Sequence, residues 1–338
     1  MALLDSGFVK GAARAAGFHE VGIARARPLD PGPLRRVLAA GWEADMAWLG
    51  TQAAERLDPA RLLPGARSVV ALGLSYAAPE APEPAVARVA RYARGRDYHA
   101  VMKKRLAALL RALRERDPAL GALATADVAP VMEKAWAQEA GLGWVGKNGC
   151  LITPRHGSWV LLATVLLDRE LAPDAPHPER CGDCQACLPA CPTGAIPEPG
   201  FVDARRCISF QTIERRGPVP GEVAARLGPW LFGCDDCQTV CPWNRGVPAD
   251  SDPELLPRGG PLDLGELLAL TRPEYQRRFW GTSLARANYE GLLRDAVLAA
   301  GASGDRRWLE AVRAHRESPF EGVRDAARQA LARLGERG

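Results

Sequence analysis

Two kinds of apolar pattern divide this chain. Over the first 170 residues, runs rich in Val, Leu and Ile at 20–24, 68–76 and 157–167 are typical of buried strands, and helical segments separate them. Residues 1–20 have the apolar spacing of an amphipathic helix rather than the continuous apolar core of a signal peptide. We therefore expect a mixed α/β domain over residues 1–170.

A helical pattern follows from Leu262 onward. Apolar residues recur every three or four positions at 283–301 and at 323–335, and residues 306–319 join these two segments. They resemble a short stack of helical pairs of the HEAT type, in which each pair buries its apolar face against the next. The pattern predicts a HEAT-like helical module, which is either a binding module or a plain helical cap.

Proline-rich segments mark the breaks between these regions. Residues 77–85 are typical of a loop, residues 171–179 of a domain boundary and residues 247–261 of a linker. The sequence therefore predicts an α+β protein with three domains, at 1–170, 171–250 and 251–338. The middle domain holds eight of the nine cysteines.

Composition limits the setting of the protein. The 338 residues are 47% hydrophobic and 25% charged, which suffices for two or three domains with cores of their own. No apolar run approaches the length of a membrane helix. We expect a cytoplasmic protein, whose reducing surroundings leave thiolates free to bind metal. Nothing in the sequence suggests an obligate interface, so we expect a monomer.

The cysteines carry the clearest chemical signal. A first set is spaced by two, two and three residues and closed by Pro192, as in ferredoxins with two clusters. In such proteins the fourth cysteine of the run binds the other cluster, so a second set is required, and one closed by Pro242 follows. The expected ligands of the two 4Fe-4S clusters are Cys181, Cys184, Cys187 and Cys241 for one, and Cys191, Cys207, Cys234 and Cys237 for the other.

Three other interpretations of the cysteines are weaker. A disulfide framework belongs to small secreted chains, and no signal peptide is visible. Zinc would accept paired cysteines, but two interleaved sets that each end in Cys-Pro favour clusters. Buried free thiols would not require the cysteines to follow this regular spacing. Cys150 lies outside both sets and receives no role.

A glycine motif and two basic regions complete the inventory. Gly141, Gly143 and Gly146 spell GxGxxG, but the motif follows a helical segment and precedes a strand, the reverse of a dinucleotide site. Ten basic residues against two acidic ones lie within 85–116, and 13 Arg against 9 Asp plus Glu lie within 271–338. Either region could bind phosphates or could be a solvated helix face.

Several segments in this order resemble the epoxyqueuosine reductases, and the resemblance covers essentially the whole chain. They are residues 91–99, the stretch around Asp127, 140–148, 157–162, 207–214 and the two cysteine sets. The resemblance implies reduction of epoxyqueuosine to queuosine at the wobble position of tRNAs with a GUN anticodon. It also implies cobalamin as the cofactor, supplied with electrons by the two clusters and by a low-potential donor that the sequence does not identify.

The resemblance also implies roles for individual residues. Asp127 matches the catalytic acid of the family, and we expect its apolar neighbours to raise its pKa by desolvation. Here the family's usual Val-Asp-Thr-Gly-Pro reads Ala-Asp-Val-Ala-Pro, so positioning around the acid could differ. From the residues alone, Asp127 would be a turn residue before a helix. The expected cobalamin contacts are Arg56, Tyr92, Asp127, the backbone around Leu151 and Leu162, and Ser209. Lys147 and Asn148 are expected to contact the corrin amides or the substrate.

Two further expectations concern cobalt and tRNA. The cobalamin motif Asp-x-His-x-x-Gly is approached by Asp97 and His99 but broken at Met102, so we expect base-off cobalamin and a structural or substrate-side His99. Asp295 replaces the Asn that is frequent in the family after Arg294, which would weaken a contact there. The candidate tRNA contacts are Arg277, Arg278, Arg286, Arg294, Arg306 and Arg307.

Other functions fit the sequence less well. A ferredoxin-type electron carrier would not need the roughly 170 residues before the cysteines, judged by the size of such modules. A cobalamin-dependent reductive dehalogenase shares the cofactors, but those enzymes resemble exported proteins with a twin-arginine signal. A pure tRNA-binding protein would not need eight ordered thiolates.

Overall fold

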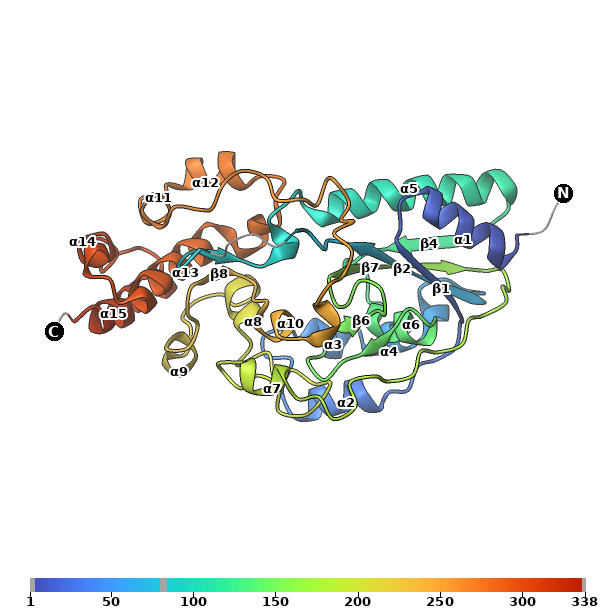
Figure 1. Ribbon diagram of the computed structural model, residues 1–338, viewed down its shortest axis with the longest axis horizontal. Coiled ribbons are helices and arrows are strands. Elements are labelled where there is room, and N and C mark those ends of the chain that lie inside the picture. The colour runs from blue at the N-terminus through green and yellow to red at the C-terminus, as the bar shows by residue number, and fades with distance from the viewer. Residues whose placement is uncertain (1–3, 80–83, 336–338) are drawn as a thin grey trace.

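The computed structural model describes residues 4–79 and 84–335 (Figure 1). A sheet lies at one end of the molecule, a helical C-terminal region lies at the other, and the cysteine-bearing segments lie between them along one side. Of the loop predicted at 77–85, residues 80–83 fall outside the described residues. None of the described helices has the length and apolarity that crossing a membrane requires.

Four antiparallel strands form the main sheet, in the order β1-β2-β7-β4. They are β1 (Glu20–Arg25), β2 (Ser68–Ser75), β7 (Val160–Leu167) and β4 (Ala122–Thr125). The three strands expected from the apolar runs are thus confirmed, and they are neighbours in space. The mixed α/β character of the first 170 residues is confirmed with them.

Side chains of β2 alternate between two apolar layers because successive residues of a strand face opposite sides. Val70 and Leu72 pack with helices α1 and α5, whereas Val69 and Ala71 pack on the other face with α6. The remaining elements of this region are α1 (Ser6–Ala15), α2 (Gly32–Ala39), α3 (Trp48–Thr51), α4 (Ala53–Leu57), η1 (Pro59–Arg61), α5 (Tyr98–Arg116), α6 (Glu133–Glu139), β5 (Trp144–Val145) and β6 (Leu151–Ile152).

The glycine motif serves close packing. A Cβ on Gly143 would lie 2.0 Å from the backbone oxygen of Ile152 in β6, so only glycine allows β5 and β6 to approach here. The motif follows α6 and leads into β5, the order expected from the sequence and the reverse of the order in a dinucleotide site.

One short segment leaves the sheet and joins the C-terminal core. β3 (Arg88–Val89) pairs in parallel with β8 (Trp230–Phe232), and Ala87 and Ala93 are buried in the same cluster as Val297. The other elements between the sheet and the helical region are η2 (Arg91–Ala93), α7 (Cys187–Ala190), α8 (Ile208–Ile213), α9 (Gly221–Ala224), α10 (Asp236–Thr239) and η3 (Pro242–Asn244).

The C-terminal region is helical, as expected. Its two long helices pack closely at Gly301 of α13. A Cβ at this position would lie only 2.6 Å from the Cα of Ala330 in α15, so the close approach depends on glycine. The stacking of helical pairs as a HEAT-like module stays a prediction. The elements are α11 (Leu264–Leu268), α12 (Arg272–Phe279), η4 (Ser283–Ala287), α13 (Asn288–Ser303), η5 (Arg306–Trp308), α14 (Leu309–Arg313) and α15 (Glu321–Arg333).

The predicted linker, residues 247–261, is anchored to the α/β region, and we call it the strap. Arg105 of α5 pairs with the buried Asp252 at 2.6 Å. Lys104 and Arg96 pair with Glu254 at 2.8 and 2.6 Å. Three basic side chains of the 85–116 region are therefore engaged within the protein, which reduces the charge left for a phosphate partner.

Candidate active site

A pocket of about 910 Å³ opens beside the N-terminal end of α5. The α3–α4 segment, the loop between β4 and α6, α8 and η4 all contribute to its wall. The wall is mixed in character, with large apolar side chains beside polar and charged ones. Lining residues that bear on the argument are Trp42, Glu43, Trp48, Arg56, Tyr92, Asp97, Tyr98, His99, Asp127, Cys207, Ser209, Phe210, Glu214 and Arg286.

Asp127 projects into this pocket from a constrained loop. Its backbone has φ of 60°, a left-handed conformation that aspartate tolerates better than most residues. The backbone N–H of Asp127 donates to Glu133 Oε1 at 2.8 Å, which ties the loop to the first turn of α6. The Tyr98 hydroxyl donates to Asp127 Oδ2 at 2.5 Å. Asp127 therefore precedes a helix, as its sequence position suggested, and it also faces the pocket.

His99 lies between Asp127 and Asp97. Its Nδ1 is 2.9 Å from Asp97 Oδ1, and its Nε2 is 3.6 Å from Asp127 Oδ2. Asp97 also caps α5 by accepting the backbone N–H of His99 at 3.0 Å. The imidazole stacks on the Tyr98 ring with centroids 4.0 Å apart. Because α5 starts at Tyr98, the helix start fixes both side chains beside Asp127.

The charges of this cluster differ from the sequence expectation. Burial alone would raise the pKa of Asp127, but hydrogen bonds from His99 and Tyr98 lower it below its usual range. Desolvation acts in the expected direction, but the other contacts outweigh it, so the expectation of a raised pKa for Asp127 is wrong. Hydrogen bonds to Asp127 and Asp97 raise the pKa of His99 to about 9. At neutral pH the pair is a carboxylate beside an imidazolium.

Glu133 and Arg56 form a second layer behind Asp127. Burial raises the pKa of Glu133 to about 7. The Arg56 side chain is only 8% exposed and lies over the Trp48 ring at 4.7 Å from its centroid. Arg56 Nε and Glu43 Oε2 are buried without a hydrogen-bond partner. An unpartnered donor and an unpartnered acceptor in the pocket wall favour a ligand that carries both acceptors and donors.

The expected cofactor contacts divide into two groups. Arg56, Tyr92, Asp127 and Ser209 line the pocket. The other four expected contacts do not line the pocket. The Lys147 ammonium donates to Gly182 O at 2.6 Å, and the Asn148 amide contacts Cys237 O at 3.5 Å. Leu151 and Leu162 pack in the apolar layer under α6.

Sequence reasoning missed several pocket residues. Tyr98 lies inside the 91–99 segment, so its position next to His99 was a usable signal. Glu133 gave no signal, because its contact with Asp127 depends on the loop conformation. Phe210 lies about 160 residues after Trp42 and Trp48, and only the fold brings these side chains together.

The two cysteine sets approach each other, and one candidate ligand reaches the pocket. α7 and α10, which carry Cys187 and Cys237, pack against each other, so the two cysteine sets interleave in space. Cys207 lines the pocket. Burial raises the pKa of Cys207 and of Cys234, so these thiols need a nearby positive charge to ionise, as bound iron provides. The donor set and its surroundings thus fit iron-sulfur clusters.

Hydrogen bonds reach cysteine sulfurs from residues outside the two sets. Trp144 Nε1–H donates to Cys181 Sγ at 3.4 Å, and the Ala195 N–H donates to Cys191 Sγ at 3.2 Å. Such bonds help to set cluster potentials. No three His, Cys, Asp or Glu side chains among the described residues are arranged to hold a single metal ion.

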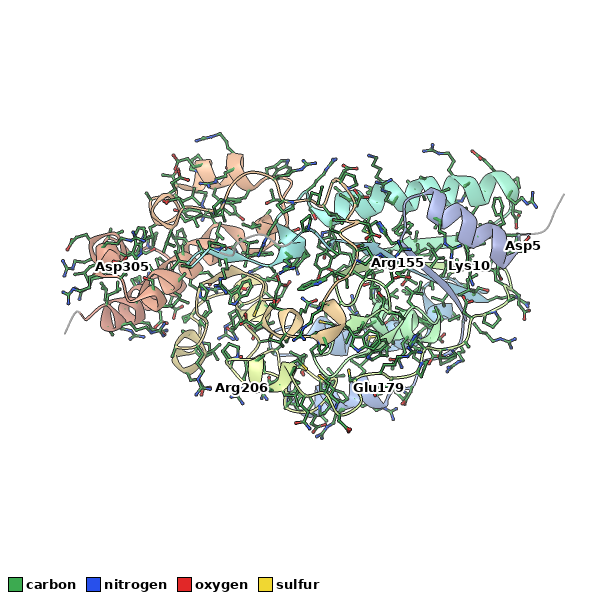
Figure 2. All side chains as sticks on the ribbon, viewed as in Figure 1. Asp5, Lys10, Arg155, Glu179, Arg206 and Asp305 are labelled. Atoms are coloured by element: carbon green, nitrogen blue, oxygen red, sulfur yellow. The ribbon has the colours of Figure 1, made fainter. Side chains whose placement is uncertain are left out.

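The candidate tRNA arginines have different environments. Arg277 and Arg306 are exposed. Arg278 pairs with Glu266 at 2.8 Å, and Arg307 pairs with Asp305, which lies at the C-terminal end of the molecule (Figure 2). Arg286 lines the pocket and pairs with Glu214 at 2.8 Å.

Arg294 is not available at the surface. Its side chain is 2% exposed, and it pairs with the fully buried Asp295. It also donates to the backbone oxygens of Gln211, Arg215 and Gly217. The expectation that Arg294 contacts tRNA, and that Asp295 would face RNA, does not agree with this burial. Arg294 instead joins α13 to α8 and to the segment that follows it, and Asp295 holds the Arg294 guanidinium.

Comparison with known proteins gives two family matches. Residues 180–244 match the model described as "4Fe-4S double cluster binding domain", and residues 56–127 match "Epoxyqueuosine reductase QueG, DUF1730". The first range contains all eight expected cluster ligands.

Similar proteins extend the match over most of the chain. An epoxyqueuosine reductase of Gloeobacter violaceus is 45% identical over 308 residues, covering 88% of this chain and 96% of the relative. One from Pseudomonas aeruginosa is 39% identical over 339 residues, covering 97% and 94%.

Solved structures agree with these relatives. The chain superposes with a TM-score of 0.85 on an epoxyqueuosine reductase bound to an epoxyqueuosine-modified tyrosine tRNA stem loop, with 31% identity, 97% of this chain and 89% of that chain covered. A Bacillus subtilis epoxyqueuosine reductase whose catalytic loop, which bears an aspartate, is swung out of the active site gives 0.86, with 30% identity and coverage of 97% and 90%.

Proposed function

The chain belongs to the epoxyqueuosine reductase family, and on that premise we propose that it reduces the epoxide of epoxyqueuosine in tRNA to the alkene of queuosine. One observation carries the proposal. The same pocket is lined by Asp127, which can transfer a proton, and by Cys207, which belongs to the cluster motifs. Reductive opening of an epoxide requires protons and low-potential electrons at one place.

The electrons would pass through two 4Fe-4S clusters. The first would be bound by Cys181, Cys184, Cys187 and Cys241, and the second by Cys191, Cys207, Cys234 and Cys237. The spacing of the two sets and the match to a double-cluster domain support this assignment. Because Cys207 lines the pocket, the second cluster would be the one next to the substrate, and the first would accept electrons from a donor.

The pocket would hold cobalamin. When bound, a reduced corrin supplies the strong nucleophile or electron donor that no amino-acid side chain provides. The corrin carries peripheral amides, and these would satisfy the unpartnered Arg56 Nε and Glu43 Oε2. Tyr92 and Ser209 offer further contacts. The volume and the mixed wall suit a large, flat and amphipathic ligand.

We propose the base-off form, with no histidine on the metal. Of the described residues that line the pocket, His99 is the one histidine, and both of its ring nitrogens face carboxylates. An imidazolium in this position has no free lone pair to offer to cobalt. His99 would therefore act on the substrate side, as one of the two roles that the sequence left open.

The protein's own residues would then orient the substrate and move protons. Asp127 would deliver a proton to the departing epoxide oxygen, and Tyr98 and Glu133 would hold its carboxyl group and its backbone in place. The pocket wall would exclude bulk water around the reacting carbons. Val128, next to Asp127, is 77% exposed, so the outer side of this loop is open to an incoming nucleotide.

The substrate would be a tRNA with a GUN anticodon, bound by the HEAT-like module. Arg277, Arg306 and Arg307 are exposed and could contact phosphates, and Arg286 lies where the flipped nucleotide would enter the pocket. Arg278 would first have to leave Glu266. An unidentified low-potential electron donor, a monomeric state and a cytoplasmic location complete the proposal.

The deciding experiment is anaerobic turnover. Protein reconstituted with iron, sulfide and cobalamin is given a low-potential reductant and tRNA carrying epoxyqueuosine, and the nucleosides are analysed by mass spectrometry. Loss of one oxygen that depends on cobalamin would support the substrate, cofactor and reaction together. If cobalamin and both clusters bind but the epoxide survives, the substrate assignment fails.

A further inference from the structure

Asp127, the expected acid, is held as a base. The Tyr98 hydroxyl donates to Asp127 Oδ2 at 2.5 Å, and His99 Nε2 lies 3.6 Å from the same oxygen, within ion-pair distance. Both contacts favour the carboxylate over the carboxylic acid. The proton that the reaction needs is therefore stored beside Asp127 rather than on it.

His99 is built to carry that proton. A neutral imidazole has one N–H and can donate to only one of two flanking carboxylates, whereas an imidazolium donates to both. Asp97 lies at one ring nitrogen and Asp127 at the other. The stack on Tyr98 and the cap at Asp97 fix the plane of the ring, so Nε2 keeps facing Asp127.

The reaction needs more than one proton. Converting an epoxide to an alkene breaks both C–O bonds, forms the second bond between the two carbons, and releases the oxygen as water. This consumes two electrons, which the external reductant supplies through the clusters, and two protons. One carboxylic acid carries one proton, so a single acid must be reloaded within each turnover.

We propose that His99 is the proton source of the reaction, reloading Asp127 for each of the two transfers. This inference rests on the proposed function. In each transfer the His99 ring would close from its 3.6 Å ion-pair distance to hydrogen-bond distance, and a proton would pass from Nε2 to Asp127 Oδ2 and then to the substrate oxygen. The His99 side chain is 39% exposed, so the ring regains its proton from water. His99 thus acts through Asp127, while Asp97 keeps the ring in position.

Charged groups on the neighbouring elements suit this relay. Arg56 from α4 and Arg286 from η4 place positive charge near Asp127, which keeps it ionised between transfers. The pKa of Glu133 on α6 is raised by burial to about 7, so Glu133 titrates below His99. The remaining charged or titratable neighbours are Tyr92 and Tyr98, whose pKa values burial raises, and Glu214, which is paired with Arg286.

The test compares His99→Gln with His177→Gln in protein loaded with both clusters and cobalamin. His177 lies beside Trp144, outside the pocket lining, and serves as the control for losing an imidazole. For His99→Gln we expect kcat to fall about 10²- to 10⁴-fold, the range of general acid catalysis. KM for an epoxyqueuosine stem loop should stay nearly constant, because binding contacts are kept. The wild-type rate should fall above a pH of about 9, and this limb should be absent in His99→Gln.

A second readout does not depend on turnover. The chain has five histidines, so their ring signals can be assigned one by one in NMR titrations of the oxidised holoprotein. We expect the His99 ring to keep both protons up to a pH of about 9. A His99 that titrates near its usual value, or a His99→Gln variant with the wild-type rate from pH 6 to 10, would overturn the relay. A wild-type protein that leaves the epoxide intact would instead overturn the proposed function.

Discussion

His99 and His156 have nearly the same chemical partners but lie in different parts of the molecule. Like His99, His156 lies between two carboxylates, with Glu20 Oε1 at 2.7 Å from Nδ1 and Asp250 Oδ2 at 3.2 Å from Nε2. Burial alone would lower the pKa of His156, but these two hydrogen bonds raise it above its usual value. Both rings therefore favour the imidazolium form.

Access to solvent separates the two sites. The His156 side chain is 0% exposed, whereas that of His99 is 39% exposed and lines the pocket. His156 connects β1, through Glu20, with the start of the strap, through Asp250. Arg155, labelled in Figure 2, adds a second contact to Asp250 at 3.3 Å. The same grouping of side chains thus joins distant segments at one site and can exchange protons at the other.

Replacing the Asp127 carboxyl group should have the largest effect on turnover. In Asp127→Asn the side chain keeps its size but cannot release a proton, so turnover should fall by about 10³-fold or more, near the upper range for general acids. Cobalamin absorbance and iron content should match the wild type. Nucleoside analysis by mass spectrometry measures the rate, and full activity in this variant would remove Asp127 from the mechanism.

The buried histidine should affect stability instead of rate. His156→Gln removes the charged partner of Glu20 and leaves Asp250 with Arg155 alone, and we expect a loss of about 1–3 kcal/mol in the free energy of unfolding. The rate per folded molecule should stay unchanged, since His156 does not line the pocket. Urea unfolding followed by far-UV circular dichroism measures the first, and turnover the second. A His156→Gln variant that turned over slowly but was as stable as the wild type would contradict the proposed difference between His156 and His99.

Neutralising Asp97 should have a smaller effect on the pocket. Asparagine caps a helix about as well as aspartate, so Asp97→Asn keeps the start of α5 and removes only the charge. The pKa of His99 should then fall, and each unit of fall reduces the protonated fraction at alkaline pH about tenfold. The pH profile of kcat should shift to lower pH with the plateau rate kept. An unshifted profile would show that Asp97 does not support the relay.

The smallest expected effect is the contribution of His99 to the pH dependence of stability. The pKa of His99 is raised from 6.5 to about 9, so its charged contacts stabilise the fold fully below pH 6.5, and this contribution is lost as pH rises through about 9. The difference in unfolding midpoint between wild type and His99→Gln should therefore be greatest near pH 6 and vanish above about pH 9. A difference that grew with pH would contradict the assigned charge.

Sequence patterns predicted the local features of this protein better than the distant contacts. Cysteine spacing identified the cluster region because metal ligands must recur at fixed separations. Apolar runs located three strands of the sheet. Family resemblance selected Asp127, whose own neighbourhood suggested only a turn. The charge state of Asp127 could not be predicted, because it depends on His99, which the fold brings beside it.

Charged residues show the same limit. Arg294 and Asp295 are consecutive in a helix and resemble a solvated pair, yet both are buried because α13 is enclosed by the helices and strands around it. Likewise, α5 gave the pattern of a basic surface, although Arg105 is committed to Asp252. A one-dimensional pattern records that a charge exists but does not record where its partner lies.

The strap has a consequence for exchanging parts between related proteins. Its Asp252 and Glu254 are bound by α5, the helix that presents Tyr98 and His99, and Asp250 is bound by His156. A chimera that takes its helical C-terminal region from one relative and its sheet from another would have to inherit residues 247–261 together with the α5 basic residues. If the two parent sequences were joined within this segment, the acidic residues of one parent would face the basic residues of the other, next to the helix that carries Tyr98 and His99.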